Sequence, residues 1–271
     1  MKKDIFNNIK EQLKDYKYSS MKYTEYEEIS NYDVICNNEQ LILTFGFNVE
    51  AGLYEFHWAT NSASILLKEV NKSNEKVLIT FIPTEWIEEF RKNKFNIYAL
   101  WNDYFHNDIS KSLDQVKSME FLKECDFKKA SEVTLSCRGQ SRGFSGQTEE
   151  WMKQWIKGTE SNSVSLGGKD GAVLVHSEND NITGIICIGI YGYDESDGPI
   201  LWVREIAVLP EYQRRGIAKP LLNQALFYGK SKGAKRAFLM ADECNKHAIK
   251  LYESVGFIAN KSEAQNDMIR K

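Results

Sequence analysis

The chain has 271 residues, of which 42% are hydrophobic and 27% are charged, close to the averages of soluble globular proteins. Its 35 Lys and Arg against 38 Asp and Glu give a formal net charge of -3, which disfavours nucleic acid and anionic membrane surfaces as partners. The length predicts one large domain or two modest ones, because domains usually hold roughly 100 to 200 residues.

No segment is typical of a membrane span or a secretion signal. The longest weakly polar run, residues 182–193, is well short of the roughly 20 residues that cross a bilayer. The first residues stay charged through Tyr16, without an apolar core like that of a secretion signal. We therefore expect a cytoplasmic protein that does not enter a membrane.

Cysteine and histidine are too scattered to suggest a disulfide framework or a metal site. The five cysteines contain no C-x-x-C pair, and no two of the four histidines lie three to five residues apart. We expect reduced thiols and no bound metal.

Glycine separates the two halves of the chain. Only Gly46 and Gly52 of the 17 glycines precede residue 131, so tight turns concentrate in the second half. The boundary is expected near residue 128, within a polar, Lys-rich segment. This gives an N-terminal domain of residues 1–128 and a C-terminal domain of residues 129–271.

The first half alternates helical and strand patterns. Phe6, Ile9 and Leu13 recur at helical spacing and predict an amphipathic opening helix. After it we predict strands at 53–58, 76–82 and 95–104, and helices at 61–70, capped by Asn61 or Ser62, and at 83–92, with proline in the first turn. This order predicts an α/β domain, and it contains no glycine-rich loop or clustered acid, base and nucleophile.

The second half begins with an alternating run after residue 129, which we interpret as a strand. Residues 172–176 and 182–190 flank a polar turn and predict a hairpin, and residues 200–208 add another strand. Between the first strand and the hairpin lie residues expected to set substrate specificity: Arg138, Arg142, Phe144, Trp151 and Trp155. Trp151 and Trp155, four apart, are expected to pack one helix face into the core.

A strand, a basic loop and a helix follow in order from Ile200. Val208 leads into Leu-Pro-Glu-Tyr-Gln-Arg-Arg-Gly-Ile-Ala, and apolar residues from Leu221 then repeat at helical spacing. Pro220 is tolerated only near the first turn of a helix, so the helix must start close to Gly216. Its unpaired N–H groups and dipole would suit a phosphate, and Gly216 would let the anion approach the backbone.

The pattern V-x-P-x-x-Q-R-R-G-I-A at residues 208–218 resembles the acyl-CoA loop of the GNAT acetyltransferase superfamily. Ala218 replaces the commoner final glycine of that loop. A second motif agrees: N-x-x-A-x-x-L-Y-x-x-x-G-F, from Asn245 to Phe257, follows a predicted strand at 237–242. The resemblance covers roughly residues 130–271 and implies a mixed central sheet flanked by helices.

The resemblance implies acetyl-CoA as acyl-donor cosubstrate. Strand residues before the loop would pair with pantetheine amides, loop amides would hold the pyrophosphate, and the asparagine of the second motif would lie near the pantetheine arm. Carried onto this sequence, the cofactor-binding residues are Ile206, Ala207, Val208, Gln213, Arg214, Arg215, Gly216, Ile217, Ala218 and Asn245. Asn245 equally suits a helix N-cap.

Two catalytic residues are expected. Tyr252 matches the position where the family often places a general acid for the departing thiolate. Because a tyrosine is a weak acid toward a thiolate, we expect it mainly to hydrogen-bond the sulfur; a core aromatic is the alternative. Glu205, a carboxylate in an apolar run, is the favoured general base. A salt bridge is its alternative role, and Asp242 and Glu243 are weaker candidates for the base.

The expected activity is acetyl transfer to an amine or hydroxyl of a small molecule or peptide. A non-catalytic acyl-CoA-binding regulatory module is the alternative, whereas the missing G-x-G-x-x-G argues against a dinucleotide-dependent oxidoreductase. The first half echoes the strand and helix order of the second, so we expect a degenerate GNAT-like repeat without a cofactor site, or else an unrelated α/β domain. It would wall the acceptor site or form a homodimer surface.

Overall fold

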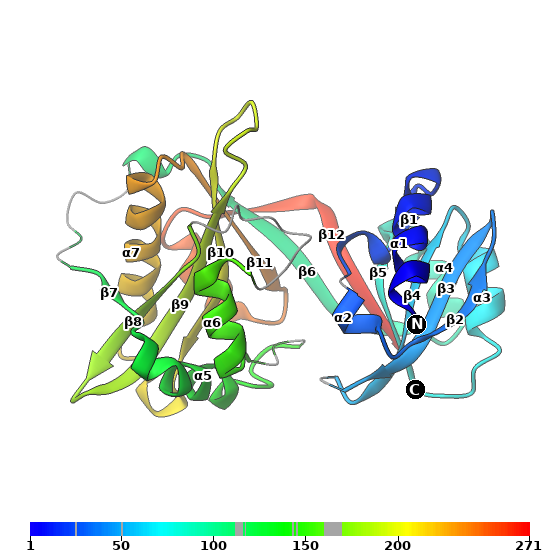
Figure 1. Cartoon of the computed structure of the whole chain (residues 1–271), viewed down its shortest axis with the longest axis horizontal. Helices are drawn as coiled ribbons and strands as arrows, with labels where there is room; N and C mark the ends of the chain where they lie inside the picture. The colour runs from blue at the N-terminus through cyan, green and yellow to red at the C-terminus, as the bar shows by residue number, and fades with distance from the viewer. Residues whose placement is uncertain are drawn as a thin grey trace. The chain divides into compact units, whose positions relative to one another are not determined.

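The computed structural model contains two compact units (Figure 1). It describes residues 1–24, 26–49, 51–111, 116, 118–142, 144, 146–159 and 170–271. Unit 1 comprises Met1–Trp101 and Ala264–Lys271, and unit 2 comprises Asn102–Glu263. These bounds differ from the expected boundary near residue 128, because two long strands, β6 (Asn96–His106) and β12 (Ile258–Arg270), each supply residues to both units.

Unit 1 is built on a mixed sheet with the strand order β2-β3-β4-β5-β12. Its strands before β6 are β1 (Tyr18–Ser19), β2 (Asp33–Asn37), β3 (Leu41–Asn48), β4 (Leu53–Thr60) and β5 (Val77–Ile82). Its α-helices are α1 (Lys3–Gln12), α2 (Tyr26–Ile29), α3 (Ala63–Val70) and α4 (Ile87–Lys92). Short 3-10 helices lie at Leu13–Asp15, Met21–Tyr23 and Thr84–Trp86.

The elements predicted in the first half are confirmed with small shifts of their ends. Ser62 is the N-cap of α3, its hydroxyl accepting from the Ile65 amide. The helix predicted from Pro83 begins as a 3-10 turn and becomes α-helical at Ile87. Phe6 and Ile9 are the buried residues of α1.

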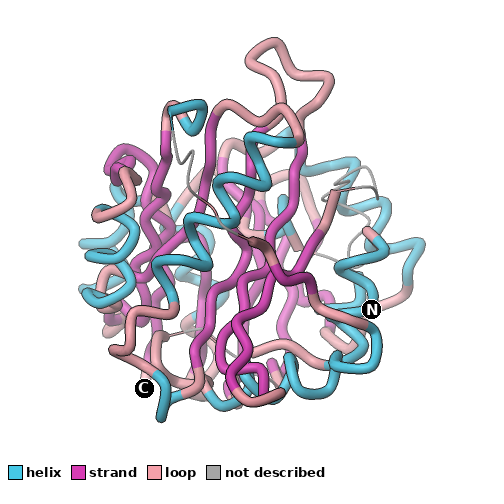
Figure 2. The backbone as a smooth tube through the Cα atoms, turned by 90° about the vertical axis from the view of Figure 1, so that its left-hand side faces the viewer, coloured by secondary structure: helices cyan, strands magenta, loops and turns pink. Residues whose placement is uncertain are grey.

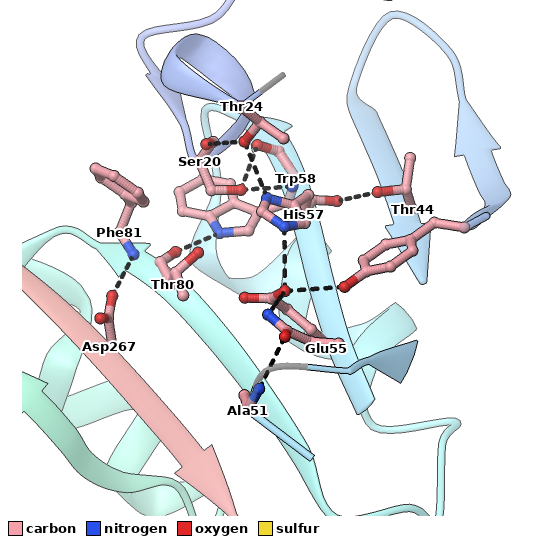
Figure 3. A network of polar contacts seen from close by, with 12 residues as sticks. Ser20, Thr24, Thr44, Ala51, Glu55, His57, Trp58, Thr80, Phe81 and Asp267 are labelled. Atoms are coloured by element: carbon pink, nitrogen blue, oxygen red, sulfur yellow. Dashed lines mark hydrogen bonds and ion pairs between the residues drawn. The ribbon is translucent and has the colours of Figure 1, made fainter. Parts of the chain in front are cut away.

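Unit 1 contains a buried polar network around Glu55 and His57 (Figure 3). Glu55 accepts hydrogen bonds from Tyr32 Oη (3.1 Å) and Asn48 Nδ2 (2.9 Å), and its Oε2 lies 3.3 Å from His57 Nε2. Burial raises the pKa of Glu55, but its hydrogen bonds and the charge of His57 outweigh burial and lower the pKa. The network satisfies a carboxylate that would otherwise be costly to bury.

Unit 2 has the strand order β11-β10-β9-β8-β7, and β6 lies beside β11. Its strands are β7 (Glu120–Phe121), β8 (Ala172–Glu178), β9 (Asn181–Tyr191), β10 (Ile200–Val208) and β11 (Arg236–Asp242). Its α-helices are α5 (Phe127–Ser136), α6 (Glu149–Lys157), α7 (Ala218–Ser231) and α8 (Lys246–Glu253). Short 3-10 helices lie at Ile109–Lys111, Glu124–Asp126 and Pro210–Tyr212.

Helices cover both faces of the unit 2 sheet, and each face has its own apolar core (Figures 1 and 2). One core contains residues of α7 and α8, together with Leu174 and Leu201. The other contains residues of α5 and α6, together with Val173 and Val175. Adjacent residues of β8 thus point to opposite faces, as the pleat of a strand requires.

The second-half predictions are confirmed from residue 172 onward, including the hairpin of β8 and β9 and the strand–loop–helix order around residue 216. The strand predicted after residue 129 was wrong. Those residues form α5, whose buried Phe127, Ala130 and Val133 repeat at helical spacing. Trp155 of α6 is fully buried and stacks on Trp151 with ring centroids 5.0 Å apart, which confirms their packing role.

Candidate functional site

The parallel ladder between β10 and β11 is short. It pairs Ile200–Trp202 with Arg236–Phe238 and ends there. On its other side, β10 stays paired with β9 as far as Val208, which is opposite Gly184. Among the described residues, the edge of β10 that carries Ile206, Ala207 and Val208 therefore has no paired strand toward β11. Apart from the Val208 carbonyl, which already accepts hydrogen bonds from side chains, backbone groups on this open edge are available to an extended ligand.

A β-bulge at Arg204 changes the direction of the side chains that follow. The register of β10 with β9 shifts between Val203 and Glu205. Before the bulge, Leu201 and Val203 belong to the core beneath α7; after it, Ala207 belongs to the core beneath α5 and α6. Because the extra residue reverses the alternation, Glu205 points toward α5 at the point where the strands part.

The turn after β10 is tied back to the strand. Gln213 Nε2 donates to the Val208 carbonyl (3.0 Å) and to Gln140 Oε1 (3.1 Å). Arg214 and Gly216 have left-handed φ angles of 61° and 84°. A left-handed arginine is uncommon, and such conformations concentrate at binding sites. Ile217 is buried in the core and anchors the turn.

Several backbone N–H groups at the start of α7 have no hydrogen-bond acceptor among the described residues. Ile217 is the N-cap residue and provides no side-chain cap, and the amides of Arg214, Arg215 and Gly216 donate to no described residue. A Cβ placed on Gly216 would meet nothing within 4 Å, so the space in front of this turn is open. A 14-residue helix directs its positive end here. These residues fit a pyrophosphate, as the acyl-CoA assignment requires.

The two arginines of the turn differ in their contacts. Arg215 Nη2 donates to the Glu211 carbonyl (2.9 Å), and its guanidinium lies 4.7 Å from the centroid of the Tyr212 ring. Arg214 is exposed at the surface of the turn. Arg215 thus braces the turn, whereas the Arg214 side chain extends from it.

The second motif forms α8 and the turn after it. Asn245 is the N-cap, its Oδ1 accepting from the Ala248 amide over 3.2 Å, so its predicted structural role is confirmed. Tyr252 is buried, with its ring centroid 6.3 Å from those of Tyr104 and Phe257. Burial raises the pKa of Tyr252, and neighbouring Tyr104 raises it further. Its hydroxyl therefore stays protonated at neutral pH.

Glu205 is buried and polar contacts hold its carboxylate. Gln147 Nε2 donates to Glu205 Oε1, and Arg204 Nη1 lies 3.6 Å from the same oxygen. Glu205 faces the α5 side, whereas Tyr252 belongs to the core beneath α7 and α8.

Comparison with known proteins identifies this arrangement. Residues 138–257 match the model of the acetyltransferase (GNAT) family. The second half of this chain carries a GNAT acetyltransferase domain.

Individual relatives agree on the fold. The crystal structure of a GCN5-related N-acetyltransferase from Sphaerobacter thermophilus has a TM-score of 0.58 at 12% identity, over 92% of this chain and 86% of that one. A GNAT-family acetyltransferase from Colwellia psychrerythraea has a TM-score of 0.55 at 12% identity, over 98% and 95%. Mycothiol acetyltransferase of Thermobispora bispora is 39% identical over 62 residues, 23% of this chain. That match spans only 21% of the enzyme's length.

In the GNAT domain, the segment between α5 and α6 contacts both β10 and β11. Arg142 donates from Nε to Asp242 Oδ2 (2.8 Å) and from Nη2 to Asp242 Oδ1 (2.5 Å), at the end of β11. Gln147 contacts Glu205 on β10. The carboxylate of Asp242, a weaker candidate for the base, is therefore engaged by a bidentate ion pair.

Sequence patterns found the loop, the N-cap and the buried tyrosine of this domain, but missed Gln147 and the partner of Arg142. Both pairs join residues far apart in sequence, by 58 and 100 positions. No periodicity or motif connects such positions.

Among the described residues, no helix is both long and apolar enough to cross a bilayer.

Proposed function

We propose that the GNAT domain transfers an acetyl group from acetyl-CoA to an amine or hydroxyl of a small-molecule or peptide acceptor. The observation that carries the proposal is the early end of the β10–β11 ladder beside an uncapped, glycine-containing turn. An open strand edge and a set of free amides lie next to each other along one segment. This combination suits a long ligand with amide groups at one end and a pyrophosphate at the other.

Different groups of the chain would bind different parts of acetyl-CoA. Ile206, Ala207 and Val208 would pair with the pantetheine amides along the edge of β10. The amides from Gln213 to Ala218 would hold the pyrophosphate, with Arg214 adding charge, and Asn245 would lie near the pantetheine arm. Acetyl-CoA, when bound, supplies an acetyl group as a thioester.

Two side chains would take part in the reaction, one as a proton acceptor and one as a hydrogen-bond donor. An amine must lose a proton to attack, and the Glu205 carboxylate would accept it. Tyr252 stays protonated, since burial raises its pKa, and would donate a hydrogen bond to the departing sulfur. A raised pKa makes full proton transfer from Tyr252 less favourable, which supports the hydrogen-bonding role.

A non-catalytic acyl-CoA-binding regulator is the second candidate, because the binding features alone do not require turnover. Thiol release from acetyl-CoA, measured against simple amines, polyamines, aminoglycosides and peptides, separates the two. Acceptor-dependent release that Glu205→Gln abolishes supports the enzyme. Tight acetyl-CoA binding without release for every acceptor supports the regulator.

We further propose that unit 1 is a degenerate GNAT-like repeat that binds no acetyl-CoA. Its β4–β5 ladder is parallel, like that of β10 and β11, and pairs Tyr54–Phe56 with Val77–Ile79. Only Asn61 and Ser62 separate β4 from α3, whereas residues 209–217 separate β10 from α7. A two-residue connection is too short to surround a pyrophosphate.

A further inference from the structure

Glu205 is held by a neutral amide. Gln147 Nε2 donates to Glu205 Oε1, and Gln147 lies in the segment that joins α5 to α6. Glu205 is 7% exposed. A carboxylate this buried depends on the hydrogen bonds it accepts, and bonds to a charged acceptor are stronger than neutral ones.

Gln147 is itself fixed against α5 through its backbone. Its N–H donates to Thr134 Oγ1 (2.8 Å), and its carbonyl accepts from Ser131 Oγ (2.8 Å). Ser131 and Thr134 are both buried, and both belong to α5. The Gln147 side chain therefore extends toward Glu205 from a backbone that is bonded at both ends.

Gly146 makes this attachment possible. Its φ angle is +76°, and a Cβ on it would lie 2.8 Å from the Thr134 carbonyl oxygen and 2.9 Å from Leu135 Cα. Those contacts are backbone atoms of α5, which cannot move aside. Only glycine lets the segment approach the helix closely enough for Gln147 to make its bonds.

One cation and two thiols also lie near Glu205. Arg204 Nη1 lies 3.6 Å from Oε1, beyond hydrogen-bonding distance, on a side chain that is 36% exposed. Cys187 on β9 and Cys137 at the end of α5 are the neighbouring thiols. Burial raises the pKa of both, and the charge of Glu205 raises each further, so they remain neutral.

We propose that Gln147 is the positioning residue for Glu205. Its amide orients the carboxylate at the opening between β10 and β11 and favours the charged form. In the proposed function, the charged form of Glu205 accepts the amine proton. The catalytic part of this inference therefore rests on the proposed function. Loss of the amide would raise the pKa of the Glu205 carboxyl, so that a smaller fraction is ionised and able to accept a proton at a given pH.

The test is the titration of the Glu205 carboxyl carbon, followed by ¹³C NMR in protein labelled at glutamate. The signal is assigned by its absence in Glu205→Gln. The variants are Gln147→Leu and the polar but shorter Gln147→Asn. Gln154→Leu is the matched control, since Gln154 Nε2 donates to Glu150 Oε1 (3.3 Å) on the exposed side of α6.

Both Gln147 variants should raise the Glu205 midpoint by about one pH unit or more, and the control should leave it unchanged. An unchanged midpoint in a Gln147 variant with native near-ultraviolet circular dichroism overturns the proposal; if Gln147→Leu fails to fold, Gln147→Asn decides. With an active acceptor, the acid limb of kcat/KM should move with the midpoint. A moved midpoint with full activity in Glu205→Gln supports the positioning role and overturns only the base role.

Discussion

The indole N–H of Trp58 donates to the Thr80 carbonyl over 2.9 Å, just beyond the last pair of the β4–β5 ladder (Figure 3). Trp58 is fully buried. In unit 2 the corresponding ladder also has three pairs, and the residue after the bulge is Glu205. The Trp58 indole therefore bonds to β5 beyond the end of the β4–β5 ladder, whereas no described strand pairs with β10 beyond its ladder with β11.

From this relationship we predict one acetyl-CoA per chain. Trp58→Ala should destabilise the protein by about 3 to 5 kcal/mol, as large core truncations do, without creating a second site, because unit 1 lacks the long turn. Unfolding in urea and titration of the intact chain measure the two quantities. A stoichiometry of two in either protein would contradict the assignment of unit 1.

Tyr252→Phe should lower kcat by about tenfold while leaving acetyl-CoA affinity nearly unchanged, because it keeps the buried ring and removes only the hydroxyl. Since burial raises the pKa of Tyr252, no loss of activity below about pH 10 should come from its ionisation. Tyr228→Phe, a change at another buried tyrosine, is the control. Equal kcat for both variants would reduce Tyr252 to a core residue.

We expect the stability of unit 1 to depend on pH through Asp267. Burial raises its pKa from 3.8 to about 6, although it accepts from the Phe81 amide (3.2 Å) and Trp101 Nε1 (3.0 Å). The folded state therefore holds this proton more tightly than the unfolded chain. The resulting stability is fully present below about pH 4 and is lost as the pH rises through about 6.

Asp267→Asn should consequently gain stability relative to the natural chain as the pH rises from 4 to 7. The expected change is about 3 kcal/mol, from a shift of roughly two pKa units. Free energies of unfolding in urea at several pH values measure it, and Asp4→Asn, at an exposed site of α1, is the control. A stability difference that stays constant with pH would show that Asp267 does not titrate in this range.

Local patterns predicted those parts of the fold that local chemistry determines. The capping side chains Ser62 and Asn245, and the helical spacing after Leu221, each depend on residues within one or two turns. β12 was missed because its middle residues, at 260–263 and 265–267, are polar and do not alternate with apolar ones. The bulge at Arg204 has no sequence signal, yet it determines the direction of Glu205.

The α5 segment shows a second reason why local sequence patterns fail to predict structure. Val133 and Leu135 alternate with polar residues and favour a strand locally, but burial of Phe127, Ala130 and Val133 on one side stabilises a helix. Ser131 and Thr134 then face the backbone of Gln147, which no local preference could indicate. The contacts that hold the candidate base Glu205 in place therefore arise from tertiary packing.

Calorimetric titration of Gly216→Val with acetyl-CoA asks whether the turn at Gly216 holds this ligand. Valine at a φ of 84° forces the turn to change, while the open space around Gly216 lets the fold survive. Gly233→Val carries the same backbone strain, at φ 91° and equally open, but lies beyond α7. We predict at least about tenfold weaker binding for Gly216→Val, a loss of about 1.4 kcal/mol, and unchanged binding for Gly233→Val. Natural affinity in a folded Gly216→Val protein would exclude this turn as the acetyl-CoA site.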